Sequence, residues 1–267
     1  MNIVPILQNI FSLTNSKNHT IINFLGLRIK YKHRNIPEQS HPISTYASGY
    51  EIHGQNNKII IIEENGSERQ LLPNEKIDGL NIRINADNSL VRIQKPTKFR
   101  DCTLLIENDN CTYDIKSTIY EIGGTIFHLS APCCKIQIGH NLSTGCGTQI
   151  NGFSSENVTV SIGNDCMISF GVIIRPDDGH TIFSPESKQI LNYGKDIKIG
   201  NHVWLGEQVI ILKGAVIPDN TIVGAKSLVN KQFQPGGGVS IAGIPAKIIK
   251  TNINWSRLPQ YIFKQTN

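Results

Sequence analysis

Aromatic residues make up only 7% of this 267-residue sequence, and charged residues only 18%. Aromatic side chains contribute much of a conventional β-sandwich core, so their scarcity argues against that architecture. No apolar run approaches the roughly 18 residues that cross a bilayer, which predicts a soluble or peripheral protein. The length suits one large domain or two modest ones.

Paired CxxC spacings are also missing, although the sequence contains six cysteines. Their absence argues against a zinc site, so we expect no metal and reduced cysteines packed as small hydrophobic residues. Met1–Phe11 has neither the basic start nor the small-residue cleavage site of a secretory signal, which predicts a cytoplasmic protein. The net charge of +5 comes without basic blocks interleaved with aromatics in the second half, so nucleic acid is not an expected partner.

The second half of the sequence contains six aliphatic residues spaced six positions apart. They are Ile199, Leu205, Ile211, Ile217, Val223 and Val229. A helix repeats its apolar face at about 3.6 residues and a strand at about 2, so neither element produces this period. A parallel β-helix does, because each face of a triangular coil uses about six residues and directs one aliphatic side chain inward. A second ladder of apolar or small residues has the same period: Val203, Val209, Ala215, Thr221 and Ser227.

Looser repeats precede this ladder, which suggests that coiling begins earlier. Clusters rich in Asn, Asp or Gly introduce aliphatic runs at Gly54–Ile59, Ala86–Leu90, Asn108–Thr112 and Gly139–Leu142. Asn and Asp tolerate left-handed backbone angles and therefore suit the corners of a coil. We divide the chain into an N-terminal segment (1–48), irregular coils (49–135), regular coils (136–250) and a tail (251–267).

The N-terminal segment, 1–48, differs in pattern from the rest. Apolar residues within Ile3–Phe11 could form one face of a short helix, and Leu27–Lys32 alternates as a strand with basic residues on one side. Two interpretations remain open. The segment could dock on a membrane surface or a partner, or it could cap the open end of the coils, which we favour.

The repeat is interrupted from Arg175 to Lys198, and long interruptions of a compact repeat are usually functional. His180 is the only histidine in this stretch. Acyl transfer from a thioester to an alcohol needs a base near pH 7, which imidazole provides. Asp177 or Asp178 could hold its useful tautomer. Taken alone, the segment could equally be a plain turn with an exposed histidine.

Further motifs point to one family. They are Asp177–Ile182, Lys195–Gly206, Ile211–Gly214, Ile222–Val229 and Ala242–Lys250. With these motifs the region 136–250 resembles the left-handed β-helix acyltransferases, the hexapeptide-repeat family. It is most similar to bacterial O-acetyltransferases of capsule or lipopolysaccharide sugars, including those of polysialic acid type. The fold class that the resemblance implies is all-β, a left-handed parallel β-helix with an extended catalytic loop.

The resemblance also implies the chemistry. His180 would be the catalytic base with Asp178 as its partner, although many relatives lack the intervening Gly179. Acetyl-CoA would be the donor, a glycan hydroxyl the acceptor, and the enzyme a homotrimer with its sites between subunits, in the cytoplasm or peripherally at the inner membrane. The implied donor-binding residues are Trp204, Gly206, Ala225, Lys226, Asn230, Lys231, Lys247 and Lys250.

Other functions are weighed against this one. N-acylation of a nucleotide-linked amino sugar would use the same fold, and a bare β-helix could serve as a scaffold. A trimeric β-helix carbonic anhydrase would need three histidines on zinc, and His180 and His202 lack a third at a suitable spacing. We expect His202 to face solvent or a subunit interface, and Asn254–Trp255 to cover the last coil or clasp a neighbouring subunit.

Overall fold

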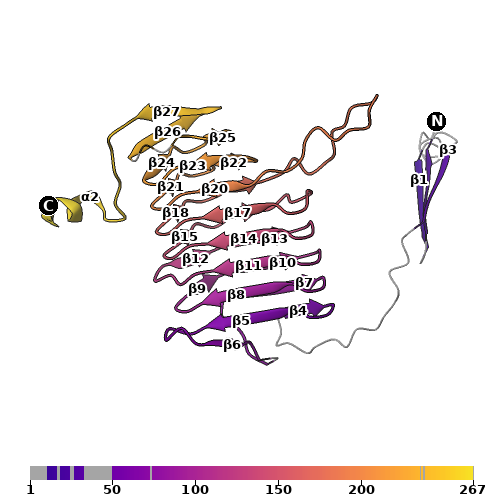
Figure 1. Cartoon of the computed structure of the whole chain (residues 1–267), viewed down its shortest axis with the longest axis horizontal. Coiled ribbons are helices and arrows are strands. Elements are labelled where there is room, and N and C mark those ends of the chain that lie inside the picture. The colour runs from indigo at the N-terminus through magenta and orange to yellow at the C-terminus, as the bar shows by residue number, and fades with distance from the viewer. Residues whose placement is uncertain are drawn as a thin grey trace, which may run out of the picture. The chain divides into compact units, whose positions relative to one another are not determined.

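The computed structural model describes residues 11–16, 19–24, 27–32, 50–72, 74–234, 236 and 238–266. The chain divides into two compact units, Met1–Pro42 and Ile43–Asn267. The first unit contains an antiparallel sheet of β1 (Phe11–Ser16), β2 (His19–Phe24) and β3 (Leu27–Lys32) (Figure 1). The expected strand at Leu27–Lys32 is confirmed. Most of the expected N-terminal helix lies outside the described residues, and the role of this unit stays a prediction.

The second unit coils through three eight-stranded sheets, here called the first, second and third faces (Figure 1). The first face runs β4 (Tyr50–His53), β7 (Leu80–Asn85), β10 (Cys102–Ile106), β13 (Thr125–Leu129), β16 (Thr148–Ile150), β19 (Ile173–Arg175), β22 (Ile210–Leu212) and β25 (Leu228–Val229). The second face runs β6 (Glu68–Gln70), β5 (Lys58–Ile62), β8 (Leu90–Gln94), β11 (Thr112–Ile115), β14 (Lys135–Ile138), β17 (Thr159–Ile162), β20 (Ile197–Ile199) and β23 (Val216–Ile217). The third face runs β9 (Lys98–Arg100), β12 (Glu121–Gly123), β15 (Ser143–Thr144), β18 (Met167–Ile168), β21 (Trp204–Leu205), β24 (Thr221–Val223), β26 (Val239–Gly243) and β27 (Ala246–Lys250).

Neighbouring strands of each face are parallel, except β6 beside β5 and β27 beside β26. A helix, α2 (Gln260–Thr266), ends the described chain. Three parallel faces visited in turn by successive coils make a parallel β-helix, as the spacing of aliphatic residues predicts.

The length of a coil changes along the β-helix. In the last coils Leu228 pairs with Ile210, 18 positions back, which is the predicted hexapeptide geometry. In earlier coils Ile126 pairs with Thr103, 23 positions back, because the corners carry extra residues. Coiling already begins at β4, since Tyr50 pairs in register with Ile82. The corner clusters therefore mark true coils before the regular repeat.

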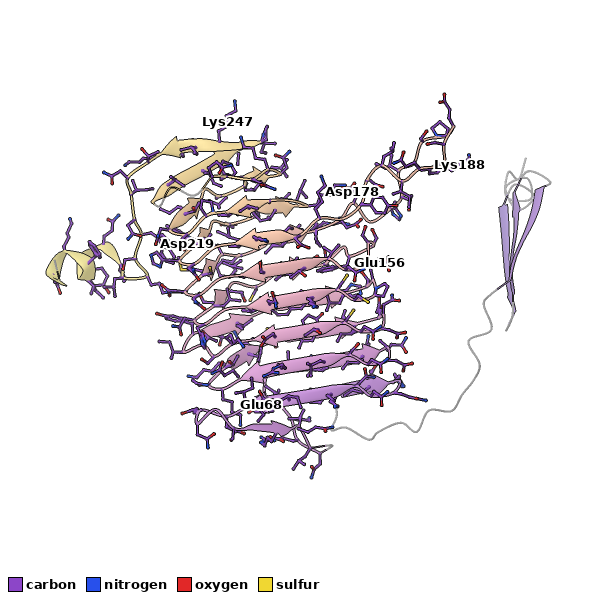
Figure 2. The ribbon with its side chains drawn as sticks, in the orientation of Figure 1. Glu68, Glu156, Asp178, Lys188, Asp219 and Lys247 are labelled. Carbon is purple, nitrogen blue, oxygen red and sulfur yellow. The ribbon has the colours of Figure 1, made fainter. Side chains whose placement is uncertain are left out.

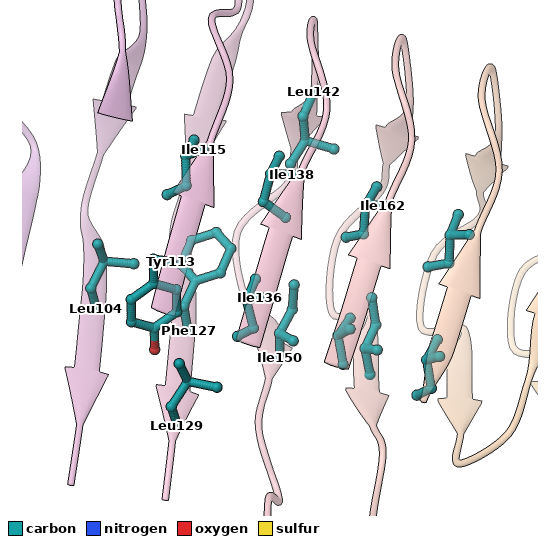
Figure 3. Close-up of a cluster of buried hydrophobic side chains, with 14 of the residues drawn as sticks. Leu104, Tyr113, Ile115, Phe127, Leu129, Ile136, Ile138, Leu142, Ile150 and Ile162 are labelled. Atoms are coloured by element: carbon teal, nitrogen blue, oxygen red, sulfur yellow. The ribbon is translucent and has the colours of Figure 1, made fainter. Parts of the chain in front are cut away.

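Stacked aliphatic side chains fill the inside of the coils. Every member of the two predicted ladders is at most 3% exposed, from Ile199 through Val229 and from Val203 through Ser227. Figure 3 shows the same stacking in earlier coils, where Ile115, Ile138 and Ile162 follow one another along one face. Burying each such side chain contributes about 1.5–3 kcal/mol, so the repeated stack is the main source of stability.

Asparagines turn many corners in the left-handed backbone region. Asn56, Asn88, Asn110 and Asn141 have φ between 54° and 60°, which an L-residue other than Asn, Asp or Gly adopts at a cost. These four residues lie in the predicted corner clusters, and their conformation confirms that interpretation.

Candidate active site

The long loop between β19 and β20 leaves the β-helix at the corner between the first and second faces (Figure 1). Asp177 is buried at the start of the loop, and its carboxylate accepts hydrogen bonds from the hydroxyls of Ser154 and Ser155 on the preceding coil. The Ser155 hydroxyl oxygen accepts a hydrogen bond from the N–H of Gly194 at 2.7 Å, where the loop returns. Both ends of the loop are therefore tied to the same coil.

The charge of Asp177 is maintained by these hydrogen bonds. Burial by itself would raise the pKa of this carboxyl, but donors from Ser154, Ser155 and the Gly179 N–H (2.9 Å) outweigh the burial. The net pKa is lowered from the ordinary value of 3.8. Asp177 is thus an ionised anchor for the loop at neutral pH.

Asn192 fastens the two arms of the loop together. Its Nδ2 donates to the carbonyl oxygen of His180 at 2.7 Å and to Asp178 Oδ2 at 3.0 Å, and its Oδ1 accepts from the Ile182 N–H at 2.7 Å. Figure 2 shows Asp178 close to the coils and Lys188 at the far end of the loop. The backbone on both sides of His180 is fixed, although the loop projects away from the β-helix.

His180 is exposed and lines a hollow of about 380 Å³ together with Asn192 and Tyr193. Within the described residues its imidazole makes no hydrogen bond, so both ring nitrogens are free to meet a substrate. The Asp178 carboxylate instead accepts from Lys213 Nζ and from Asn192, and the bond from Lys213 is the main cause of its lowered pKa. The structure thus places Asp178 near His180 in sequence but directs its carboxylate to Lys213, and its role as partner of the base stays a prediction.

Trp204 lies on β21 of the third face, away from the corner that carries His180. Its indole Nε1 donates to Ser169 Oγ at 3.3 Å. The half-buried ring lines a second, more apolar hollow of about 780 Å³ with Trp255, Leu258 and Phe263 of the tail. The two hollows share no lining residue.

Three other predicted donor-binding residues share the edge that follows Trp204. A Cβ on Gly206 would lie 2.7 Å from the backbone N of Ala225, so only glycine allows the successive coils to approach here. The next residue, Lys226, donates its N–H to the Glu207 carbonyl oxygen at 2.8 Å and is exposed. The structure therefore brings these residues together on one corner of successive coils.

The remaining predicted lysines lie towards the C-terminal end of the coils. Asn230 and Lys231 follow β25 and are exposed, and Lys231 Nζ lies 5.1 Å from the ring centroid of Phe233. Lys247 (Figure 2) and Lys250 are exposed on β27, the last strand of the third face. Together they give this end of the β-helix several cations for an anionic ligand.

No protein-family model matches this sequence. The chain is, however, 38% identical over 171 residues to the polysialic acid O-acetyltransferase of Neisseria meningitidis, covering 64% of this chain and 77% of that protein. The chain belongs to the hexapeptide-repeat acetyltransferases. A polysialic acid O-acetyltransferase of Escherichia coli O1:K1 is 39% identical over 123 residues, which cover 46% of this chain but only 38% of that relative's length. The crystal structure of the polysialic-acid-specific acetyltransferase NeuO superposes with a TM-score of 0.64 at 28% identity, covering 79% of this chain and 91% of that one.

In this acetyltransferase the position of the tail differs from one expectation from the sequence, which concerns His202. His202 does not lie open to solvent, because Trp255 stacks on it with ring centroids 4.2 Å apart and planes 9° apart; a place at a subunit interface stays a prediction. The Trp255 indole also donates to the His202 carbonyl oxygen at 2.8 Å, and His202 Nδ1 lies 2.7 Å from Asp165 Oδ2. The physical reason is that the corner residue His202 leaves a flat ring on the surface for the tail to cover.

Arg257, two residues after Trp255, extends the contact of the tail to residues of earlier coils. It donates to Ser143 Oγ at 2.7 Å, to the carbonyl oxygens of Asn141 and Cys166 at 3.1 and 2.8 Å, and to Asp165 Oδ1 at 3.3 Å. The tail therefore binds its own chain over several coils, rather than only covering the last one.

Several residues of the candidate site were not found from the sequence. They are Ser154, Ser155, Asn192, Lys213 and Arg257, and Trp255 was expected only to cover the last coil or to clasp a neighbouring subunit. Asn192 lies in the interruption of the repeat and Lys213 in one of the motifs that the sequence singles out, but nothing in their spacing indicates their partners. Of the described helical residues, none forms a segment long and apolar enough to cross a bilayer. The described residues also contain no group of three or more His, Cys, Asp or Glu side chains placed to hold a metal ion.

Proposed function

We propose that this chain transfers the acetyl group of acetyl-CoA to a hydroxyl of a bacterial surface polysaccharide, with His180 as the general base. The observation that carries the proposal is the position of His180, exposed on a loop whose ends are anchored by Asp177 and Asn192. The relatives' names, polysialic acid and galactoside O-acetyltransferases, indicate the class of acceptor.

The free imidazole of His180 suits direct transfer. It removes the proton of the acceptor hydroxyl, whose oxygen attacks the thioester carbonyl carbon. The tetrahedral intermediate then collapses, the C–S bond breaks, and the imidazolium returns the proton to the leaving thiolate. Asn192 fixes the backbone of His180, so the imidazole is attached at a fixed position when the acceptor hydroxyl binds.

The third face and its last corner suit the donor. The apolar hollow beside Trp204 has the character needed for the pantetheine arm, and the exposed Lys226, Lys231, Lys247 and Lys250 suit the phosphates. Ala225 is exposed at the same edge, where Gly206 allows the successive coils to approach.

We infer that the working enzyme is a homotrimer. His180, at the corner between the first and second faces, and Trp204, on the third face, line separate hollows, so one chain alone does not bring base and donor together. In a trimer the loop of one subunit can meet the third face of its neighbour. We further infer that the enzyme acts in the cytoplasm, or peripherally at the inner membrane.

Replacement of His180 tests the proposed function. His180→Ala should lower kcat by about 10²- to 10⁴-fold, because the general base is lost, while CoA affinity by calorimetry stays within about twofold. Acetylation is measured by mass spectrometry of a surface oligosaccharide, with a nucleotide-linked amino sugar as the competing acceptor. A near wild-type rate in the variant would contradict the role of His180, and preferential N-acylation would contradict the choice of acceptor.

A further inference from the structure

The hollow beside His180 contains carboxylates but no basic side chain. Glu156, which follows Ser155 on the preceding coil, and the anchor Asp177 both line it, and none of the described lining residues is a lysine or an arginine. Glu156 lies on the side of the coils from which the loop projects (Figure 2). A sugar that brings a hydroxyl to His180 therefore enters a hollow with two carboxylates.

The cations around the loop lie outside this hollow. Lys213 Nζ donates to the Asp178 carboxylate, and neither of these two residues lines the hollow. The other basic residues of this region, which do not line it either, are Arg175, Lys188 and Lys195. No cation of the described residues therefore offsets the carboxylates where the acceptor binds.

The Glu156 side chain is free to bind a ligand. It is exposed, and among the described residues its carboxylate has no hydrogen bond and no ion pair. A carboxylate accepts hydrogen bonds through both oxygens, so it can bind two neighbouring hydroxyls of a sugar. It repels a second carboxylate at the same place. Glu156 thus distinguishes sugars by their charge.

Tyr193 adds a flat apolar surface to the same hollow. It lies on the returning arm of the loop, and it is 60% exposed although it is a large aromatic residue. The electron-rich face of an aromatic ring suits the C–H groups on the face of a sugar ring. This contact does not depend on the charge of the sugar. The hollow therefore combines an aromatic surface with an acceptor of hydroxyl hydrogen bonds.

We propose that this hollow binds an uncharged sugar unit, with Glu156 accepting from its hydroxyls and Tyr193 stacking on its ring, and that Glu156 disfavours carboxylated sugars. The inference rests on the proposed function and assigns the acceptor unit to the neutral sugars. It departs from the acidic polymer, polysialic acid, in the names of two relatives. Glu156 is a specificity-determining residue in this account, because it contacts the acceptor away from the reacting hydroxyl.

The test uses two pairs of acceptors, and the members of a pair differ only in charge. The acidic members are oligomers of sialic acid and of a hexuronic acid, and the neutral members are the same oligomers with their carboxylates reduced to alcohols. Wild-type KM should be about three- to tenfold lower for the neutral members, since the interaction of two unit charges 4 Å apart in water corresponds to about fivefold in affinity. Glu156→Gln should remove this preference by lowering KM for the acidic members, while KM for acetyl-CoA stays within about twofold.

Glu186→Gln is the matched control, because Glu186 is exposed on the same loop but does not line the hollow. This variant should keep the wild-type preference. Tyr193→Ala should raise KM for acidic and neutral members alike, by about two- to tenfold, because an aromatic contact is lost. The wild-type preference should also weaken at about 1 M salt, where the Debye length is about 3 Å.

Calorimetric binding of the four oligomers, without acetyl-CoA, keeps this inference separable from the proposed function. Tighter binding of the neutral members that Glu156→Gln removes supports the inference even where no acetylation occurs. Tighter binding of the acidic members by the wild type would overturn it. So would a preference that Glu156→Gln leaves unchanged, or an absence of binding by both neutral oligomers. The proposed function is decided separately, by the turnover of His180→Ala.

Discussion

Asp177 and Asp178 are adjacent in sequence but differ in surroundings. Asp177 is buried and accepts from two serines of the preceding coil and from the Gly179 N–H, whereas Asp178 is exposed and pairs with Lys213 of the following coil. Substituting the two separately therefore distinguishes anchoring of the loop from any effect on the proposed base, His180.

The lowered pKa values of Asp177 and Asp178 predict how the loop responds to acid. A carboxyl whose folded pKa lies below its unfolded value stabilises the fold above the unfolded pKa, and this contribution is lost as pH falls through the folded value. We expect hydrogen exchange in 176–195, corrected for intrinsic rates, to increase below about pH 4.

Asp177→Asn is the control for that prediction. The amide cannot accept from both serines and the Gly179 N–H, so the variant should exchange quickly already at neutral pH and show a smaller acid step. Exchange that follows the wild-type profile in this variant would show that Asp177 does not anchor the loop.

At the scale of an element, the tail makes contacts that the sequence repeats do not predict. Arg257 makes four hydrogen bonds to residues of earlier coils and lies 4.1 Å from the ring centroid of Tyr120. Its side chain is 17% exposed, which limits competition from water.

Arg257→Ala should lower the free energy of unfolding by roughly 2 kcal/mol, because buried carbonyl groups lose a charged donor. Urea denaturation followed by circular dichroism measures this loss. The control is Arg83→Ala, whose ion pair with Glu51 is 60% and 58% exposed and should contribute less than about 0.5 kcal/mol. Equal losses in the two variants would mean that the tail contributes no more than a surface pair.

The elements differ in how well the sequence predicts them. The ladder from Ile199 to Val229 and the loop bounds follow from the sequence, since inward positions recur at fixed spacing and the loop breaks that spacing. The Ser155–Asp177 contact does not follow, because it depends on how corners of successive coils with extra residues align. The stacking of Trp255 on His202 cannot be predicted either, because the tail has no sequence period that aligns it with a particular coil.

At the scale of the whole molecule, stability is distributed along a column in which each coil contacts its neighbours. Ile211 is fully buried at the centre of the regular ladder. Ile211→Ala should lower the free energy of unfolding by about 2–4 kcal/mol, since the coils on either side prevent collapse of the cavity.

Ile249→Ala is the matched control, because Ile249 is 64% exposed on β27. Its loss should change the free energy of unfolding by less than about 0.5 kcal/mol in the same titration. A similar effect of the two substitutions would contradict the inward ladder as the source of stability.

The long loop between β19 and β20 has a consequence for how such proteins diversify. Ile174 and Ile211 pair across the loop as if it were absent, although 37 positions separate them. A longer loop would therefore destabilise the core very little, because the entropic cost of closing a loop rises only slowly with its length. Asp177 and Gly194 tie the two ends of the loop to Ser155 of the preceding coil, so the segment between them can be replaced without disturbing the coils. Variation of this segment then leaves the scaffold of stacked coils unchanged.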